Sequence, residues 1–176
     1  MKKLVSLFIL MTLVLSSAMA QSAHREVGSL SINAGIGLGI AGRSGYSVVL
    51  PPLKVDVDYT VLSFSNRMSL SAGGYFSLGT DRLKSYDTTV TTFLVGPMAC
   101  FRYALTDSFD LFGKGIIGYL GVNTSDPMVN SIIGKSHVGA GFYVGGTWYF
   151  SSKLGLGAEL GYGGPTTIGM HLTIRL

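Results

Sequence analysis

Eight ionisable residues share one property: each stands in the polar half of a stretch in which apolar and polar residues alternate. They are Lys54, Asp56, Asp58, Arg102, Lys114, Glu159, His171 and Arg175. Alternation with a period of two places successive side chains on opposite faces of a β-strand, so these groups would all face the same side of a sheet. Such a set can neutralise itself as ion pairs, line a polar conduit, or carry acid–base chemistry.

The strands that carry these residues follow from the alternation and from the turn residues between the runs. The clearest is the closing hairpin, residues 154–162 and 168–176, which is joined at Gly164-Pro165. The same pattern predicts six earlier strands, at 30–40, 53–61, 68–78, 92–105, 111–121 and 138–150. In the fifth strand bulky residues fall on both faces. We therefore use Lys114 to set the inward side, which turns Gly113, Gly115 and Ile117 outward.

The connections between these eight strands alternate in length. Long loops are predicted at 41–51, 80–91 and 122–136, and short turns near 65–66, 106–110 and 151–153. An up-and-down barrel with long loops at one rim and short turns at the other produces this rhythm. Pro97 falls inside the fourth strand, where a missing N–H interrupts the ladder, so we expect a β-bulge there.

The N-terminal residues have the order of a secretory signal peptide. Lys2 and Lys3 precede an apolar core at 4–15, and Ala18-Met19-Ala20 forms a small-x-small cleavage site before Gln21. The apolar core is too short to span a bilayer as a helix, which needs about 20 residues. We therefore assign residues 1–20 to a cleaved signal peptide and 21–176 to one exported domain.

The composition then separates a membrane barrel from a water-soluble one. Only 12% of the residues are charged, and 25 are glycine, whereas soluble proteins average about 25% charged residues and about 7% glycine. The polar face of the strands holds mainly Gly, Ser and Thr, which suit the crowded interior of a narrow barrel. A soluble ligand-binding barrel would need the opposite polarity, with apolar groups inside. The sequence predicts an all-β, eight-stranded antiparallel up-and-down transmembrane β-barrel in a bacterial outer membrane.

The chain resembles the small eight-stranded outer-membrane barrels of OmpA/OmpX type, especially the porin-like outer-membrane β-barrel proteins common in Bacteroidetes. The resemblance covers the whole chain after residue 20. It rests on the Ala-Met-Ala-Gln cleavage site, on Gly96-Pro97 leading into Phe101-Arg102-Tyr103, on residues 111–115, and on the alternating last strand. It implies lipid contact and delivery to the barrel-assembly machinery through the C-terminal strand. The family usually ends in an aromatic residue, whereas this chain ends in Leu176.

For the polar residues in the lumen we expect ion pairing rather than catalysis or transport. An eight-stranded barrel is just wide enough for its own side chains to fill it, and charges removed from water need partners. His171 with Glu159 and Thr173 suggests, as an alternative, a lipid-modifying enzyme of the outer leaflet, and a narrow passive pore is another. No serine has the setting of an activated nucleophile, and the histidines do not have the spacing of metal ligands. We therefore assign no catalytic residue, metal or cofactor.

Interaction through the outer loops is the remaining expectation. The predicted loops carry exposed charged and aromatic residues of the kind that binds partners. The candidates are Arg43, Tyr46, Arg82, Lys84, Tyr86, Asp126 and Lys135. No ligand code appears among them. The formal net charge is only +4, with two of the lysines in the signal peptide and no basic cluster elsewhere, so nucleic acid is not an expected partner. We expect a monomer.

Overall fold

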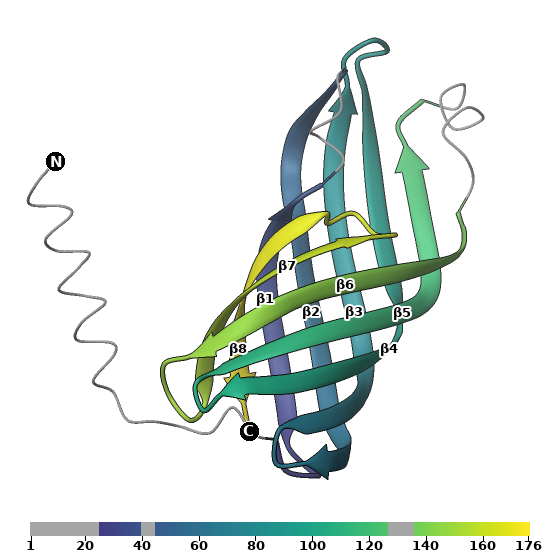
Figure 1. Cartoon of the computed structure of the whole chain (residues 1–176). Coiled ribbons are helices and arrows are strands. Elements are labelled where there is room, and N and C mark those ends of the chain that lie inside the picture. Colours follow the sequence, from purple (N-terminus) through teal and green to yellow (C-terminus); the bar gives the residue numbers. More distant parts are fainter. Residues whose placement is uncertain (1–24, 40–44, 127–135) are drawn as a thin grey trace, which may run out of the picture.

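The structure is a computed structural model that describes residues 25–39, 45–126 and 136–176. It contains eight strands in chain order (Figure 1). They are β1 (Leu30–Leu38), β2 (Tyr46–Ser65), β3 (Met68–Leu83), β4 (Thr88–Thr106), β5 (Phe109–Thr124), β6 (His137–Tyr149), β7 (Leu154–Tyr162) and β8 (Ile168–Arg175). Each strand pairs antiparallel with the next, and β8 pairs with β1 to close the barrel. The predicted eight-stranded up-and-down barrel is confirmed, while the predicted signal peptide lies outside the described residues.

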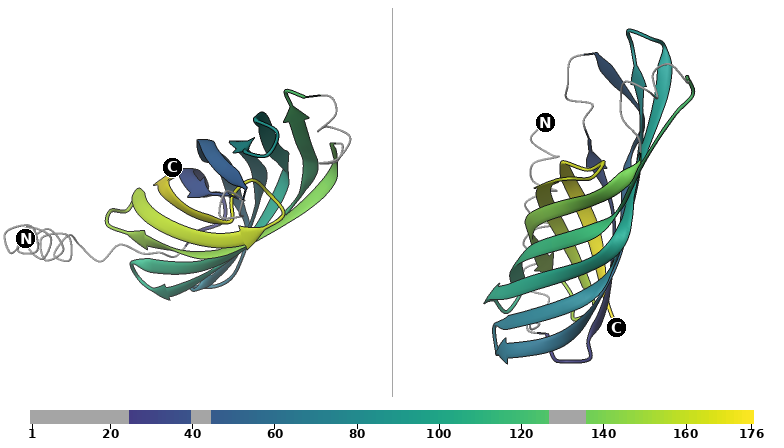
Figure 2. Two further views of the ribbon diagram at one scale, coloured as in Figure 1. Left: turned by 90° about the horizontal axis from the view of Figure 1, so that it is seen from above. Right: turned by 90° about the vertical axis from the view of Figure 1, so that its right-hand side faces the viewer.

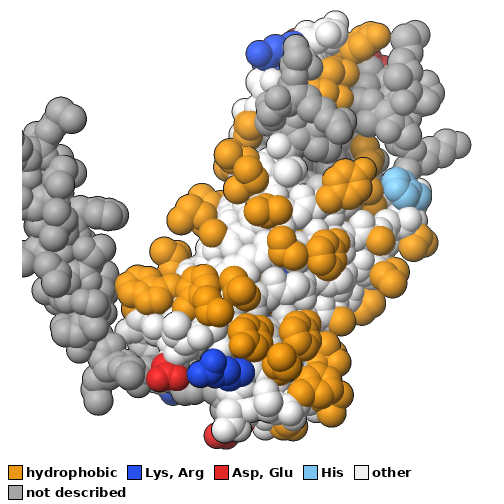
Figure 3. Space-filling model, in the orientation of Figure 1, with side chains coloured by type: hydrophobic (Ala, Val, Ile, Leu, Met, Phe, Trp, Pro, Cys, Tyr) orange, Lys and Arg blue, Asp and Glu red, His pale blue; other side chains and the backbone are white. Residues whose placement is uncertain are grey.

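The two faces of the barrel are sorted as the alternation predicts. Apolar side chains such as Ile36 and Leu160 point outward and are 59% and 61% exposed. Figure 3 shows apolar side chains over the visible wall, with charged side chains near its ends. Lys114 is buried and its neighbours Gly115 and Ile117 are exposed, so the inward side of the fifth strand is as expected. Within the described ranges, no helix is long and apolar enough to cross a membrane.

The strands on one side of the barrel are longer than predicted, and the loops are correspondingly shorter. β2 begins at Tyr46, β3 ends at Leu83 and β4 begins at Thr88. Most of the loops predicted at 41–51 and 80–91 is therefore strand, and β5 likewise runs on to Thr124. Figure 2 shows β2 to β5 rising beyond the ends of β6 to β8. Two features hid these extensions: Pro51 and Pro52 interrupt the alternation in β2, and polar residues predominate at the end of β3 and the start of β4.

The bulge expected at Pro97 is absent. Pro97 pairs with Gly74 in an unshifted β3–β4 register. On its other side the pairing passes from Val95–Tyr119 to Met98–Ile116 without a shift. The prediction was wrong because a ladder can omit a hydrogen bond at proline and keep its register. Register shifts lie elsewhere: in β2 between Val48 and Leu53, around Pro51 and Pro52, and between Thr60 and Ser65, and at the end of β4 between Ala104 and Thr106.

Inward-facing glycines allow neighbouring strands to approach in this narrow barrel. A methyl carbon added to Gly73 would lie 1.8 Å from the carbonyl oxygen of Val57 on β2. At the outward-facing Gly113, an added methyl carbon would have no atom within 4 Å. The high glycine content therefore includes positions that curvature requires and others that it does not.

This difference gives a matched test of the fold. Replacing Gly73 with Ala should lower the free energy of unfolding by about 2 kcal/mol or more, since the overlap is with backbone that cannot rotate away. Replacing Gly113 with Ala should change it by no more than about 0.5 kcal/mol. Urea titration of both variants refolded in detergent micelles measures the two values. Equal losses would contradict the assigned close approach.

Candidate functional site

The lumen of the barrel collects the ionisable residues that the alternation singled out. Seven of the eight are at most 3% exposed, and Arg175, near the C-terminal end, is partly exposed. They come from β2, β4, β5, β7 and β8. Members of neighbouring strands meet because their positions are opposite or diagonal in the ladders, as Lys54 and His171 are on either side of Gly35.

The centre of the lumen is a chain of alternating charges. The Nζ atom of Lys114 lies 2.8 Å from Oδ2 of Asp56 and 3.1 Å from Oε2 of Glu159. The Nζ atom of Lys54 lies 2.5 Å from Oε1 of Glu159. All four side chains are fully buried. Two ammonium groups and two carboxylates thus neutralise each other away from water, which is the arrangement that buried charges require.

His171 belongs to this group as a neutral acceptor. Its Nδ1 atom lies 3.2 Å from Nζ of Lys54 and 3.8 Å from Oε2 of Glu159. An ammonium group can only donate, so Nδ1 accepts and the imidazole proton is on Nε2. Thr173 instead donates its hydroxyl to Oδ1 of Asn33, 2.7 Å away. The hydrolase-like grouping of His171 with Thr173 therefore has no direct hydrogen bond that supports it, and each side chain serves the polar network.

A second charged group lies toward the short-turn end and is joined to the first. Nη2 of Arg102 donates to Oδ2 of Asp58 over 2.9 Å. Nη1 of Arg102 lies 3.4 Å from Oδ2 of Asp110. The amide nitrogen of Asn33 donates to Asp56 over 2.6 Å and to Asp58 over 3.1 Å. The lumen charges therefore form one connected network.

Several members of the network were not predicted from the sequence. They are Arg25, Asn33, Asp110 and Tyr149, all buried. Asp110 was expected in a turn, but it is the second residue of β5 and shares the inward side with Phe112 and Lys114, so the alternation could have found it. Arg25 precedes the first strand and carries no periodic signal.

An aromatic ring separates and packs the cations. The Phe112 ring centroid lies 4.9 Å from Nζ of Lys114 and 5.3 Å from Cζ of Arg102. The Cζ atom of Arg175 lies 4.3 Å from the ring centroid of Tyr149. Ring faces attract cations in this geometry. Arg175 therefore stands at the rim over an aromatic ring, whereas the other lumen cations sit deeper.

A buried apolar cluster begins at Phe112, among the charges, and continues into the rest of the lumen. Its members come from β3 to β6, and Tyr75 and Tyr143 stack with centroids 5.6 Å apart. The full set is Tyr75, Leu94, Met98, Cys100, Phe112, Ile116 and Tyr143. No group of three or more His, Cys, Asp or Glu residues among the described ranges could hold a metal ion. The interior thus resembles a packed core more than a channel.

The turn between β7 and β8 covers this layer. Pro165 and Thr166 are buried, and the Thr167 N–H donates to the carbonyl of Leu38 over 2.8 Å. A methyl carbon added at Gly79 of β3 would lie 3.3 Å from Pro165, so the turn reaches across to the opposite wall. Seen from above, this turn crosses the barrel opening (Figure 2).

The loop candidates are partly gathered at the upper end. Tyr46 pairs beside the tip of the β3–β4 hairpin, where Lys84 and Tyr86 are exposed and Arg82 pairs with Asp87 at 2.7 Å. Asp126 follows β5, whose end is tied to β4 through Ser125 and Thr89. Arg43 and Lys135 lie outside the described residues.

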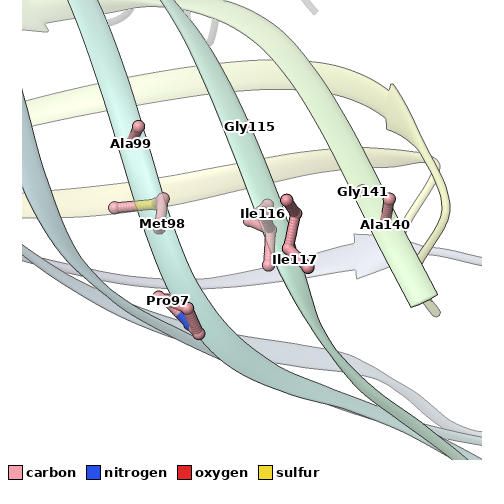
Figure 4. Close-up of a pocket in the computed structure, with 8 residues that line it drawn as sticks. All are labelled: Pro97, Met98, Ala99, Gly115, Ile116, Ile117, Ala140 and Gly141. Carbon is pink, nitrogen blue, oxygen red and sulfur yellow. The ribbon is translucent and has the colours of Figure 1, made fainter. Parts of the chain in front are cut away.

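The outer wall carries a hollow of about 550 Å³ between β4, β5 and β6. Small residues make its surface, namely Ala99, Gly115 and Ala140, with Pro97 and Ile117 beside them (Figure 4). A neighbouring hollow of about 390 Å³ shares Pro97. Both are lined by apolar groups and offer no polar chemistry.

The central charge chain makes a stability prediction. Replacing Lys114 with Met leaves Asp56 buried without its ammonium partner and removes one of the two partners of Glu159, so the free energy of unfolding should fall by about 3 kcal/mol or more. The matched control is Lys153→Met in the exposed β6–β7 turn, which should cost no more than about 0.5 kcal/mol. Urea unfolding followed by tryptophan fluorescence measures both. Similar small losses in the two variants would contradict the paired network.

No family model matches the sequence, and no curated protein matches it. The fold does match solved structures. Ail, the attachment invasion locus protein of Yersinia pestis, aligns with a TM-score of 0.52 at 14% identity, covering 86% of this chain and 100% of that one. The N-terminal β-barrel domain of Pseudomonas aeruginosa OprF aligns with a TM-score of 0.52 at 11% identity, covering 86% and 100%.

A further structure of Ail, in a phospholipid bilayer nanodisc, aligns with a TM-score of 0.50 at 16% identity and covers 85% of this chain and 99% of that one. At these identities the likeness is one of fold. It agrees with the outward apolar face and the closed ring of eight strands. The chain therefore has the fold of the small eight-stranded transmembrane barrels of bacterial outer membranes.

Proposed function

We propose that this protein is an integral outer-membrane barrel with a closed lumen, which serves a structural role or interacts with partners through the end formed by β2 to β5. The observation that carries the proposal is the single, paired charge network beneath an apolar layer and a covering turn. The apolar outer face contacts membrane lipid. The C-terminal strand, whose last amide donates from Leu176 to the carbonyl of Leu30 over 2.9 Å, would be the segment received by the barrel-assembly machinery.

Burial in successive layers argues for a closed lumen rather than a pore. Asp58 and Lys114 in the charged layers have no exposed surface, and neither have Leu94 and Tyr143 in the apolar layer. In a water-filled conduit such side chains would be exposed to solvent. The charged side chains of the lumen are also paired with one another. Among the described residues they therefore form no ring of like charges that could select an ion.

The upper end is the part of the protein best placed to meet a partner. Tyr46 begins β2, and Lys84 and Tyr86 lie in the β3–β4 turn, at the end of strands that extend beyond the barrel. A structure of Ail holds the heparin analogue sucrose octasulfate. Here Arg82 is neutralised by Asp87 at 2.7 Å, so charge alone does not favour a polyanion at this tip.

The position of the histidine supports a non-enzymatic role. His171 is 2% exposed and its Nδ1 atom is engaged by Lys54, so it has no route to a lipid in the outer leaflet. The lipid-modifying alternative remains testable. A change in the lipid A mass spectrum between a deletion strain and its parent would revive that alternative.

The closed lumen predicts electrical silence. Purified protein reconstituted in planar bilayers should give no conductance steps, because no continuous water path crosses the buried layers. A general porin in the same lipid provides the positive control for insertion and recording. Regular steps from this protein, at a frequency that scales with its concentration, would contradict the proposal.

The orientation predicts which turns face outward. An epitope inserted between Lys84 and Ser85, at the β3–β4 tip, should bind antibody on intact cells. The same epitope between Asp107 and Ser108, in the short β4–β5 turn, should bind only after the outer membrane is permeabilised. Flow cytometry of both insertions compares them directly, and the reverse pattern would overturn the assignment of the β2 to β5 extension to the cell surface.

A further inference from the structure

Arg25 lies outside every strand and yet is one of the most buried side chains described. It precedes β1 and is 2% exposed. The chain then leaves the lumen, since Glu26, Val27 and Gly28 are exposed, and the Gly28 N–H donates to the carbonyl of Thr60 over 3.0 Å. A surface segment therefore sends one charged side chain into the barrel.

The guanidinium enters a pocket built by four strands. Its Nη1 atom donates to Oδ1 of Asp58 on β2 over 2.9 Å and to Oγ of Ser31 on β1 over 2.5 Å. Its Nη2 atom donates to the hydroxyl of Tyr149 on β6 over 2.9 Å. Its Nε atom lies 4.0 Å from Oδ2 of Asp110 on β5. The acceptors are themselves held in place, because Tyr149 donates to Asp110 over 3.0 Å.

This pocket suits a guanidinium better than an ammonium. Its acceptors lie in different directions around a planar fork, whereas a lysine presents a single charged nitrogen. Arg175 lies over the ring of Tyr149 at the rim. Arg102, the other guanidinium that contacts Asp58, takes Oδ2 and so leaves Oδ1 for Arg25. The two arginines share Asp58 without competing for the same oxygen.

We propose that the segment before β1 is a tethered ligand of the barrel, and that Ser31, Asp58, Asp110 and Tyr149 form a guanidinium-binding site that Arg25 occupies. The side chain closes the short-turn end of the lumen. It also supplies a cation that balances the charge of the buried carboxylates. Without it the buried carboxylates of Asp56, Asp58, Asp110 and Glu159 would face, within the described part of the chain, only three deeply buried cations, Lys54, Arg102 and Lys114.

The site also links docking to barrel closure. Its acceptors come from β1, β2, β5 and β6, so it is complete only when strands from opposite sides of the barrel enclose one lumen. Arg25 therefore binds after closure and fixes the start of β1, the strand that meets β8 at the closing seam. When docked, the segment at residues 25–29 holds β1 in place in the closed barrel.

Trypsin tests whether the arm is docked. In the folded wild-type protein the bond after Arg25 should resist cleavage, while the bond after the exposed Arg67, in the β2–β3 turn at the same end, serves as an internal reference. The Arg25→Lys variant keeps a trypsin site but loses the fork, so its cleavage after residue 25 should be at least about tenfold faster. Equal cleavage after residue 25 in wild type and variant, each relative to Arg67, would overturn the proposal.

Chemical rescue tests the specificity of the site. The Arg25→Ala variant should unfold at least about a hundredfold faster in urea, because it leaves a buried carboxylate short of a cation. Millimolar ethylguanidinium should slow its unfolding, and ethylammonium should do so much less. The Arg67→Ala variant removes one exposed charge at the same end and should respond to neither compound. A loss in Arg25→Ala that both compounds restore equally would refute a guanidinium site.

These readouts are independent of the proposed closed lumen. If the protein conducted in bilayers but Arg25 stayed protected from trypsin, the closed-lumen proposal would fail and the tethered ligand would stand. If Arg25 were fully susceptible to trypsin in a protein that did not conduct, the tethered ligand would fail and the closed lumen would stand.

Discussion

Charge burial in a narrow lumen is the constraint on which the rest of this structure depends. Eight strands leave room for side chains but not for bulk water, so every ionised group inside must find an opposite charge within reach. Lys114 between Asp56 and Glu159, and Asp58 between two arginines, meet this demand. Removing one partner of such a pair costs far more than the pair contributes as a whole, so each buried charge depends on its partners.

The outer face obeys a complementary constraint. In hydrocarbon no water can satisfy a backbone group, so the ring must be closed and each strand paired on both sides. The β1–β8 pairing provides this closure. A slip of one residue at that seam would carry Arg175 to the outer face and Ile174 into the lumen, so the charge network and the apolar face fix the same register.

Above the closed ring, side chains need not sort into an apolar outer face and a paired polar interior. Only some of the strands extend into this region. β2 to β5 continue past the point where β6 begins and β1 ends. Their upper parts carry both polar and exposed apolar residues, Val48 and Val49 among the latter, and at the tip Arg82 pairs with Asp87. Pro165 and Thr166 are buried at the lumen end beneath them, and Arg25 is buried at the opposite end.

The sequence by itself determined the strand count, the antiparallel order and the inward side of each strand, because an alternation of period two is a local property of the chain. It also selected Lys54, Asp56, Asp58, Arg102, Lys114, Glu159 and His171 as lumen residues for the same reason. Only the tertiary structure decided which of them pair, since partners such as Lys114 and Asp56 are brought together by ring closure. It alone revealed Arg25, which lies in no periodic element, and the strand extensions beyond the barrel, where prolines in β2 and polar residues in β3 and β4 break the alternation. Pro97 shows the same limit, because whether a missing hydrogen bond shifts a ladder depends on the strands on both sides.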